Sequence, residues 1–190
     1  MTHDATIELT ARMRARLGVD PPADAGLCLG TPSAVLVPLF VHDDGSTHVW
    51  LLRKSDALRR HGGQVALPGG KVDPLDRSLV ETALREAEEE IGLSRSALEI
   101  VGQLERQPVI TGYVVTPFVA VVSPGFTPVP DPGEVARVFT APLSDFASEG
   151  SLREVSVLTF RRMVETYAVE GELVWGATAA ILKRLARRVL

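Results

Sequence analysis

The sequence feature that most constrains this chain is a group of three glutamates with helical spacing. Glu86, Glu89 and Glu90 lie in residues 85–93, which read REAEEEIGL. Spacings of three and four residues place the three carboxylates on one face of an α-helix, within an arc of about 100°. Like charges this close repel by roughly 0.2–0.5 kcal/mol for each pair one turn apart on an isolated helix. A hard divalent cation would offset the repulsion, because Mg²⁺ combines one or two carboxylates with water and substrate phosphates.

A solvated helix face is the alternative, because glutamate is a good helix former and acidic runs usually face water. The preceding residues favour a binding site. Residues 67–76 read LPGGKVDPLD, and the paired glycines let the backbone approach a ligand closely. A helix is expected at about 77–91, where Asp76 or Ser78 can cap the start and Gly92 can cap the end. We therefore expect a loop followed by a helix with one buried face and one acidic face.

Residues 70–93 resemble the signature box of the Nudix hydrolases. The box reads Gly, five residues, Glu, seven residues, then Arg-Glu-apolar-x-Glu-Glu-x-Gly-apolar, and residues 85–93 match its second half at every specified position. The first half departs twice, since Asp76 stands in place of Glu and eight residues separate Asp76 from Arg85. Both departures lie in the loop and the helix start. The metal-binding face is therefore expected to be retained, and the role of Asp76 is left open.

A second segment resembles an additional motif of the coenzyme A pyrophosphatase subgroup. Residues 50–70 read WLLRKSDALRRHGGQVALPGG. The subgroup motif reads Leu-Leu-Thr-x-Arg-Ser/Ala, three residues, Arg, three residues, Gly, three residues, Phe-Pro-Gly-Gly. The residues in register with it are Ser55, Arg59, Gly63, Pro68, Gly69 and Gly70. The departures are Trp50, Leu52, Lys54 and Leu67. Lysine at position 54 keeps the charge but lacks the planar guanidinium that binds phosphate through two bonds.

The acidic helix supplies the candidate metal ligands. Glu86 and Glu90, one turn apart, are the first candidates to bind Mg²⁺ or Mn²⁺ directly, and the resemblance implies the same positions together with the carbonyl of Gly70. Glu89, at the edge of the arc, is expected to complete a second metal site or to bind through water. Arg85 is expected to orient a carboxylate through a bidentate bond, with an ordinary surface ion pair as the alternative.

Hydrolysis of a diphosphate also needs a base and cations that hold the phosphates. Glu89 could accept the proton, directly or through metal-bound water. Glu134 is the other candidate base because it follows a loop and begins a predicted strand, although it could equally be an exposed loop glutamate. The candidate substrate-binding residues before the glycine pair are Lys54, Arg59, Arg60 and His61. Each alone is commonly a solvated charge or, for His61, a loop-stabilising donor, but coenzyme A carries an additional 3′-phosphate that such a cluster would suit.

The whole chain sets broader limits. Its 190 residues and 45% apolar content predict one domain, spanning residues 1–190, with a well-buried core. A net charge of −4 disfavours a general nucleic-acid binder. The single cysteine, Cys28, excludes an internal disulfide and fits a reducing compartment. Neither a signal peptide nor a membrane span is expected, so we predict a cytoplasmic protein without membrane or nucleic-acid partners, either a monomer or a homodimer.

The hydrophobic patterns predict the arrangement of elements. Helices are expected at 4–18, 77–91, 142–147 and 173–188. Strands are expected at 31–42, 48–53, 98–104, 113–122, 134–140, 153–160 and 163–169, with a long loop at 54–76. Strand-rich segments around two main helices predict an α+β fold, and the Nudix resemblance implies an α/β/α sandwich with a mixed sheet.

The expected function is metal-dependent hydrolysis of the pyrophosphate bond of coenzyme A or its derivatives. The resemblance implies 4′-phosphopantetheine and adenosine 3′,5′-bisphosphate as products. One alternative is a Nudix hydrolase of another nucleoside diphosphate derivative, such as ADP-ribose or a dinucleotide. Another is a nucleotide-binding module that keeps the fold without catalysis, although the intact Glu86, Glu89 and Glu90 argue against it. A structural helix without a site would require the loop signature to be accidental.

Overall fold

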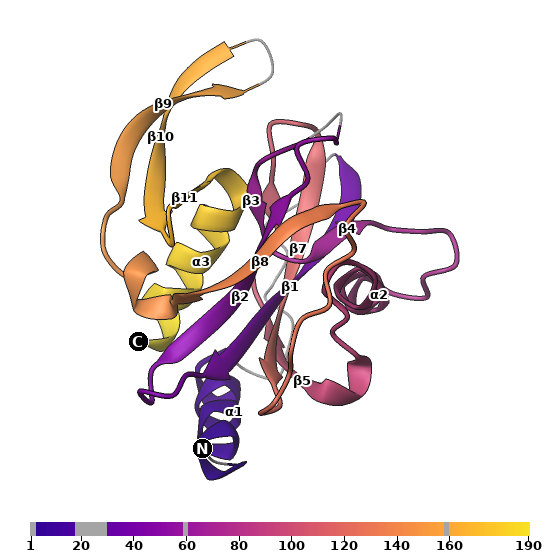
Figure 1. The fold of residues 1–190 in the computed structure, drawn as a ribbon, viewed down its shortest axis with the longest axis vertical. Coiled ribbons are helices and arrows are strands. Elements are labelled where there is room, and N and C mark those ends of the chain that lie inside the picture. Colours follow the sequence, from indigo (N-terminus) through magenta and orange to yellow (C-terminus); the bar gives the residue numbers. More distant parts are fainter. Residues whose placement is uncertain (1–2, 18–29, 59–60, 158–159) are drawn as a thin grey trace.

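The computed structural model describes residues 3–17, 30–58, 61–157 and 160–190, and Figure 1 shows their arrangement. Cys28, Arg59 and Arg60 lie outside the described residues. Within the described ranges the α-helices are α1 (His3–Leu17), α2 (Leu79–Ile91) and α3 (Gly176–Val189). Two 3₁₀ turns are η1 (Arg95–Ala97) and η2 (Leu143–Phe146). The predicted helices at 4–18 and 77–91 are thus confirmed to within two residues, and the short helix at 142–147 is the η2 turn.

The strands of the main sheet are β1 (Thr31–Val41), β2 (Thr47–Lys54), β3 (Val65–Ala66), β4 (Gly69–Lys71), β5 (Leu98–Gln103), β6 (Gln107–Pro108), β7 (Tyr113–Val122) and β8 (Val135–Pro142). Strand β1 lies at the centre, antiparallel to β2 and β4 and parallel to β7. Strand β8 pairs antiparallel with β2 along most of its length. The sheet is therefore mixed, as predicted.

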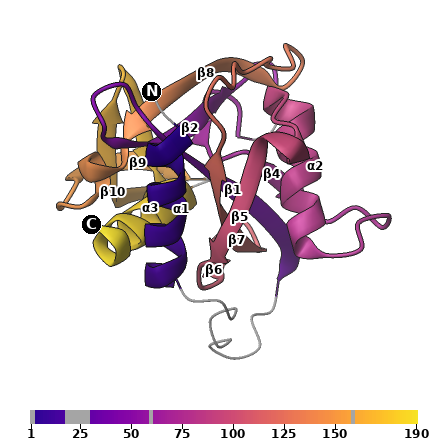
Figure 2. The same ribbon diagram turned by 90° about the horizontal axis from the view of Figure 1, so that it is seen from below.

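Helices cover both faces of this sheet, which Figure 2 shows from below. Helix α2 lies on one face, where Ala83, Ala87 and Ile91 are fully buried and share a core cluster with Leu36 and Leu52 from β1 and β2. These three helix positions recur every four residues, which places them on one stripe. The α+β class and the α/β/α sandwich are confirmed.

Helices α1 and α3 cover the opposite face. Met13 from α1 and Leu182 and Leu185 from α3 are buried in a second core cluster, together with Val37 and Leu51 from the sheet. Leu36 and Val37 are neighbours in β1, yet they belong to different clusters because successive side chains of a strand point to opposite faces. The two-sided burial explains why β1 and β7 read as nearly continuous apolar runs.

The C-terminal part forms a separate three-stranded antiparallel sheet of β9 (Ser151–Val157), β10 (Phe160–Val169) and β11 (Glu172–Trp175). The predicted hairpin of two strands is confirmed, with bounds shifted by two or three residues. The expected start of the last helix at residue 173 was wrong, because residues 172–175 pair with β10 before α3 begins. In the part of the chain that the structure describes, no helix is long and apolar enough to cross a membrane.

Candidate active site

Helix α2 is fixed at both ends by local hydrogen bonds. Ser78 is the N-cap, and its hydroxyl accepts from the backbone N–H of Glu81 at 3.3 Å. The carboxylate of Glu81 in turn accepts from the N–H of Arg77 at 2.7 Å, which satisfies a second donor at the helix start. Gly92 ends the helix in the left-handed conformation with φ of 69°. These caps set the length of α2 and so the direction of its acidic face.

The glycine pair lies in β4 against the centre of the sheet. Gly69 and Gly70 pair with Val35 and Ala34 of β1, and Gly69 has φ of 154°. A side chain at Gly69 would collide with the backbone of Ala34 and Val35. A side chain at Gly70 would collide with the carboxylate of Glu86. Glycine is therefore required at both positions. The backbone of Gly70 lies directly against Glu86 of α2, as expected if the two residues belong to one site.

Glu90 is the most buried of the acidic residues, with 1% of its side chain exposed. One carboxylate oxygen forms an ion pair with Lys54 Nζ, and the other accepts from the backbone N–H of Gly69 at 2.9 Å. Burial raises the pKa of Glu90 to about 7, although the Lys54 ammonium and the Gly69 N–H act in the opposite direction. The buried carboxylate is thus balanced by one nearby cation and one backbone donor.

The other two carboxylates are progressively more open. Glu86 is partly buried, and this burial raises its pKa, while the neighbouring Arg85 lowers it. Glu89 has 59% of its side chain exposed and accepts from Arg85 Nη1 at 2.8 Å. Arg85 Nη1 also lies 3.0 Å from Glu86 Oε1. Glu88 points away from this group and is exposed, with Arg95 at 4.0 Å as its ion-pair partner.

Asp76 positions Arg85, which in turn contacts Glu86 and Glu89. Arg85 Nε and Nη2 donate to the two oxygens of Asp76 at 3.0 and 3.1 Å, a bidentate pair. Thr82 Oγ1 donates to the same carboxylate at 2.8 Å. The Arg85 guanidinium holds the pKa of Asp76 well below its usual range. Sequence reasoning left the role of Asp76 open, yet the signal was present, since an acidic residue stands at the acidic position of the box.

Two further predicted residues, Lys54 and Glu134, also reach this site. Lys54, which the sequence placed at the start of a loop, is the last residue of β2, and its Nζ lies 3.9 Å from Glu134 Oε2 as well as beside Glu90. Glu134 is half-exposed, at 52% of its side chain. The backbone carbonyl of Glu134 accepts from the N–H of Ser55 at 2.8 Å, which anchors it to the end of β2.

The segment before β8 runs along the C-terminal end of α2 (Figure 1). The N–H groups of Val129 and Asp131 donate to the carbonyls of Ile91 and Glu90 at 2.9 and 3.0 Å. Helix carbonyls at this end have no partner within the helix, so the segment satisfies two of them. Glu134 therefore reaches the site through a connection that is bonded to α2 itself.

Three predicted substrate-binding residues remain. Two lie outside the described part, and His61 lies in the segment between β2 and β3. Arg59 and Arg60 belong to the residues that the structure does not describe. His61 is exposed, has φ of 60°, and its Nδ1 lies 2.9 Å from Gln64 Oε1. That contact fits the loop-stabilising alternative for His61.

The residues present fit a hard divalent cation. Glu86, Glu89, Glu90 and the backbone of Gly70 offer oxygen donors only, the kind that Mg²⁺ and Mn²⁺ prefer. Glu86 lies against Gly70, so a carboxylate and a backbone peptide converge where no side chain intervenes. Arg85 also forms an ion pair with Asp76. Among the residues that the structure describes, Lys54 is the cation that pairs with Glu90.

Fold and site together define the class of protein: an α/β/α sandwich in which helix α2, with its three glutamates, faces the glycine pair of β4. A family model for the NUDIX domain matches residues 30–162. The chain belongs to the Nudix family.

The sequence matches to known relatives cover most of the chain. A protein of Photorhabdus laumondii named uncharacterized Nudix hydrolase NudL is 38% identical over 178 residues, covering 93% of this chain and 94% of its own. The protein of the same name from Yersinia enterocolitica is 40% identical over 161 residues, covering 83% of this chain and 80% of its own. Among solved structures, the NUDIX domain of Shewanella oneidensis NrtR complexed with ADP ribose matches with a TM-score of 0.50 and 22% identity, covering 76% of this chain and 86% of that one. That structural likeness supports the fold alone.

Proposed function

We propose that this protein hydrolyses the pyrophosphate bond of coenzyme A or its derivatives with the help of Mg²⁺ or Mn²⁺. The observation that carries the proposal is the convergence of Glu86 and Glu90 on the backbone of the glycine pair, with Lys54 paired to Glu90. Glu86 and Glu90, with Gly70, would hold the cation. Once bound, the cation would neutralise charge on the diphosphate oxygens and lower the pKa of a coordinated water.

Two glutamates are candidates for the general base. Glu89 is exposed and held by Arg85, so its carboxylate can face a water near the metal ligands. Glu134 lies in the turn just before β8, within ion-pair distance of Lys54. Both side chains are more than half exposed, so a water molecule can reach either carboxylate. Either could take the proton from the attacking water, and a comparison of the Glu89→Gln and Glu134→Gln variants would distinguish them.

Coenzyme A is proposed as substrate because of residues 50–70, which carry the motif of that subgroup in most of its specified positions. In this proposal Lys54, Arg59, Arg60 and His61 would contact the phosphates of the substrate. In the metal-free protein Lys54 pairs with Glu90. When a cation binds Glu90, the Lys54 ammonium could move to a phosphate oxygen of the substrate. Another nucleoside diphosphate derivative is the second candidate, since a structural neighbour holds ADP ribose.

The decisive experiment is incubation of the purified chain with Mg²⁺ or Mn²⁺ and a panel of coenzyme A, ADP-ribose and dinucleotides, with identification of the products. We expect 4′-phosphopantetheine and adenosine 3′,5′-bisphosphate from coenzyme A. Preference for ADP-ribose or a dinucleotide would overturn the substrate and keep the hydrolase.

A matched pair of variants tests the site. Glu86→Gln should reduce the rate at least 100-fold, while Glu88→Gln, on the same helix but pointing away, should keep it within twofold. Tight nucleotide binding without any product would instead support a binding module.

A further inference from the structure

The hairpin between β1 and β2 gathers three residues that can bind a metal, far from the acidic helix. His42, Asp44 and His48 each offer a ligand atom, and these atoms all lie within 4.8 Å of one another. His48 and Lys54 are six residues apart in β2, and an extended strand rises about 3.3 Å per residue, so about 20 Å separates this cluster from the Lys54 side of the acidic site. The cluster is therefore a separate feature of the molecule.

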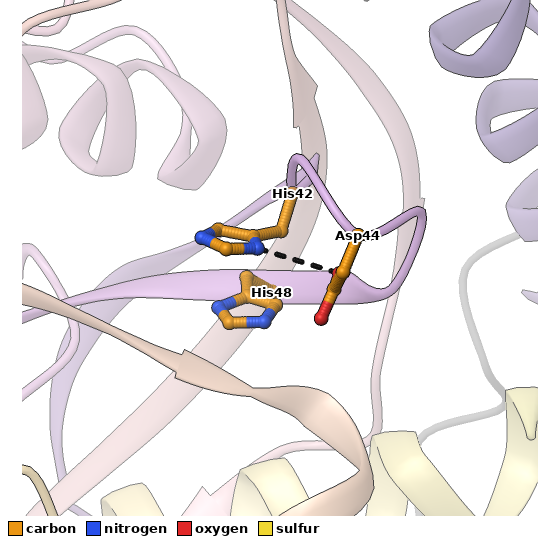
Figure 3. A group of neighbouring side chains, drawn as sticks. All are labelled: His42, Asp44 and His48. Atoms are coloured by element: carbon orange, nitrogen blue, oxygen red, sulfur yellow. Dashed lines mark ion pairs between the residues drawn. The ribbon is translucent and has the colours of Figure 1, made fainter.

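The strand register explains why the two histidines meet. Phe40 pairs with His48 in the hairpin, and the N–H of His42 donates to the carbonyl of Ser46 at 2.8 Å. Positions 40, 42, 46 and 48 therefore share one face, and the two imidazoles are diagonal neighbours. Their ring centroids lie 4.3 Å apart with an angle of 14° between the planes. Figure 3 shows the rings one above the other, with Asp44 beside them.

The turn holds Asp44 in place. Its Oδ1 accepts from the N–H and the hydroxyl of Ser46 at 2.8 and 2.6 Å. These bonds hold the pKa of Asp44 at about 2, so the carboxylate is ionised at neutral pH. Oδ1 also lies 3.3 Å from His42 Nδ1. The carboxylate is thus both charged and aimed at the histidine pair.

An independent observation points to a ligand. His48 is only 8% exposed, and its Nδ1 is buried without a hydrogen-bond partner. The Nδ1 of His42 likewise lacks a hydrogen-bond partner, despite its proximity to Asp44. Leaving a buried polar atom unpaired destabilises the fold, so such atoms call for an explanation. A metal ion would satisfy them, because a neutral imidazole nitrogen is the commonest metal ligand in proteins.

We propose that His42, Asp44 and His48 form a second metal site that binds a transition-metal ion of the Zn²⁺ class. Two imidazoles and one carboxylate match a three-ligand zinc site that leaves a fourth position open, whereas Mg²⁺ prefers oxygen donors. Tetrahedral zinc needs its nitrogen and oxygen ligands about 3.4 Å apart, from bond lengths near 2.1 Å. The His42 side chain is 43% exposed, so it can rotate to close that distance around Asp44 and the fixed His48.

The test is a titration of the full chain with Zn²⁺ against a chromophoric chelator, in millimolar Mg²⁺ so that the acidic site is saturated. The wild-type chain should bind one Zn²⁺ that Mg²⁺ does not displace. His42→Ala and Asp44→Asn should each weaken this binding at least tenfold. Asn keeps the oxygen that accepts from Ser46, so Asp44→Asn removes the charge and leaves the turn. His3→Ala removes an exposed histidine of α1 and should have no effect.

Equal Zn²⁺ affinity in wild type, His42→Ala and Asp44→Asn would overturn the proposal, as would loss of binding in His3→Ala. Because His48 is buried, His48→Gln could fail to fold, and NMR of the wild-type chain replaces it. Substoichiometric paramagnetic Co²⁺ should broaden the ring signals of His42 and His48 and spare those of His3. Broadening confined to His3 would contradict the site.

Discussion

Lys54 at the end of β2 and Glu90 on α2 form an ion pair in which the carboxylate is 1% exposed and the ammonium 15% exposed. The pair joins the central sheet to the acidic helix. It also places a positive charge beside the proposed metal ligands. A divalent cation that binds Glu90 must therefore share this carboxylate with Lys54 or displace it.

Removal of the Lys54 charge should destabilise the metal-free protein in a pH-dependent way. Breaking a buried ion pair by removing one partner costs about 3–5 kcal/mol, because the remaining charge is left without compensation. We expect Lys54→Met to lose about 3 kcal/mol at pH 8, where Glu90 is ionised, and clearly less at pH 5, where Glu90 can be protonated. Urea unfolding with a chelator measures both values.

Lys71→Met is the matched control, because Lys71 is exposed and lies over the Tyr113 ring at 5.5 Å. It should cost no more than about 1 kcal/mol at either pH. Mg²⁺ should also stabilise Lys54→Met more than wild type, since no ammonium competes for Glu90. An equal loss at pH 5 and pH 8 would contradict the assigned role of the pair.

The raised pKa of Glu90 predicts a distinctive pH profile for the metal-free protein. Its pKa is 4.5 when exposed and about 7 in the fold, so the folded state binds more protons between these values. The contribution of Glu90 to the free energy of unfolding should therefore fall as pH rises from about 4.5 to about 7, by up to about 3 kcal/mol. The difference between wild type and Glu90→Gln, measured by urea unfolding, isolates this contribution.

Two comparisons strengthen the pH test. Glu88→Gln, which alters an exposed carboxylate of the same helix, should retain the wild-type profile. Saturating Mg²⁺ should flatten the profile, because a bound cation stabilises the ionised carboxylate. A wild-type advantage over Glu90→Gln that grows with rising pH would be the wrong sign and would refute the assignment.

Asp76 should act on activity through Arg85. Its carboxylate fixes the guanidinium that contacts both Glu86 and Glu89. Asp76→Asn should cost about 1–3 kcal/mol of stability, as for a buried charged hydrogen bond. It should also lower kcat at least tenfold and raise the Mg²⁺ concentration for half-maximal activity. Arg85→Lys should do the same, because an ammonium cannot hold three carboxylates in a planar fork.

Steady-state kinetics at several Mg²⁺ concentrations measure this effect. Arg77→Lys, an exchange at an exposed position just before α2, is the control and should behave as wild type. If Asp76→Asn lowers stability while leaving both kcat and the Mg²⁺ dependence intact, Asp76 serves the fold alone.

A methyl group at Gly70 should disturb the site specifically. The added carbon would occupy the place of the Glu86 carboxylate, so Gly70→Ala should weaken Mg²⁺ binding and reduce the rate at least tenfold. Gly171→Ala provides a contrast, since Gly171 has φ of 80° in open space in the turn before β11. That change should cost about 1–3 kcal/mol of backbone strain and leave the rate per folded molecule unchanged. Similar rates for Gly70→Ala and wild type would show that Glu86 is not confined there.

The sequence predicted those parts of the fold that depend on local pattern. Helix α2 followed from Asp76 or Ser78 at its start and Gly92 at its end, and the structure confirms Ser78 and Gly92 as the caps. Strand β7 was predicted at its observed bounds from a continuous apolar run. Strand β11 was missed because four residues before a helix have no period of their own, and only their pairing with β10 reveals them.

The candidate site could be predicted only in part, for a related reason. The helical spacing gave Glu86, Glu89 and Glu90 directly. The approach of Lys54 to Glu90 depends on the packing of α2 against the sheet, and that of Glu134 to Lys54 on the pairing of β2 with β8. Both are contacts between distant segments that local pattern does not encode. The bidentate bond between Asp76 and Arg85 depends on how the loop enters the helix, which the additional residue in the box obscured.

The segment that leads into β8 has a mechanical consequence. Its backbone is hydrogen-bonded to the last turn of α2 and to the end of β2, so it links the two elements directly. A displacement of Glu90 upon cation capture would be transmitted along the main chain to Glu134 over a few residues. Cation binding at Glu90 and the positioning of Glu134 would then be a single event.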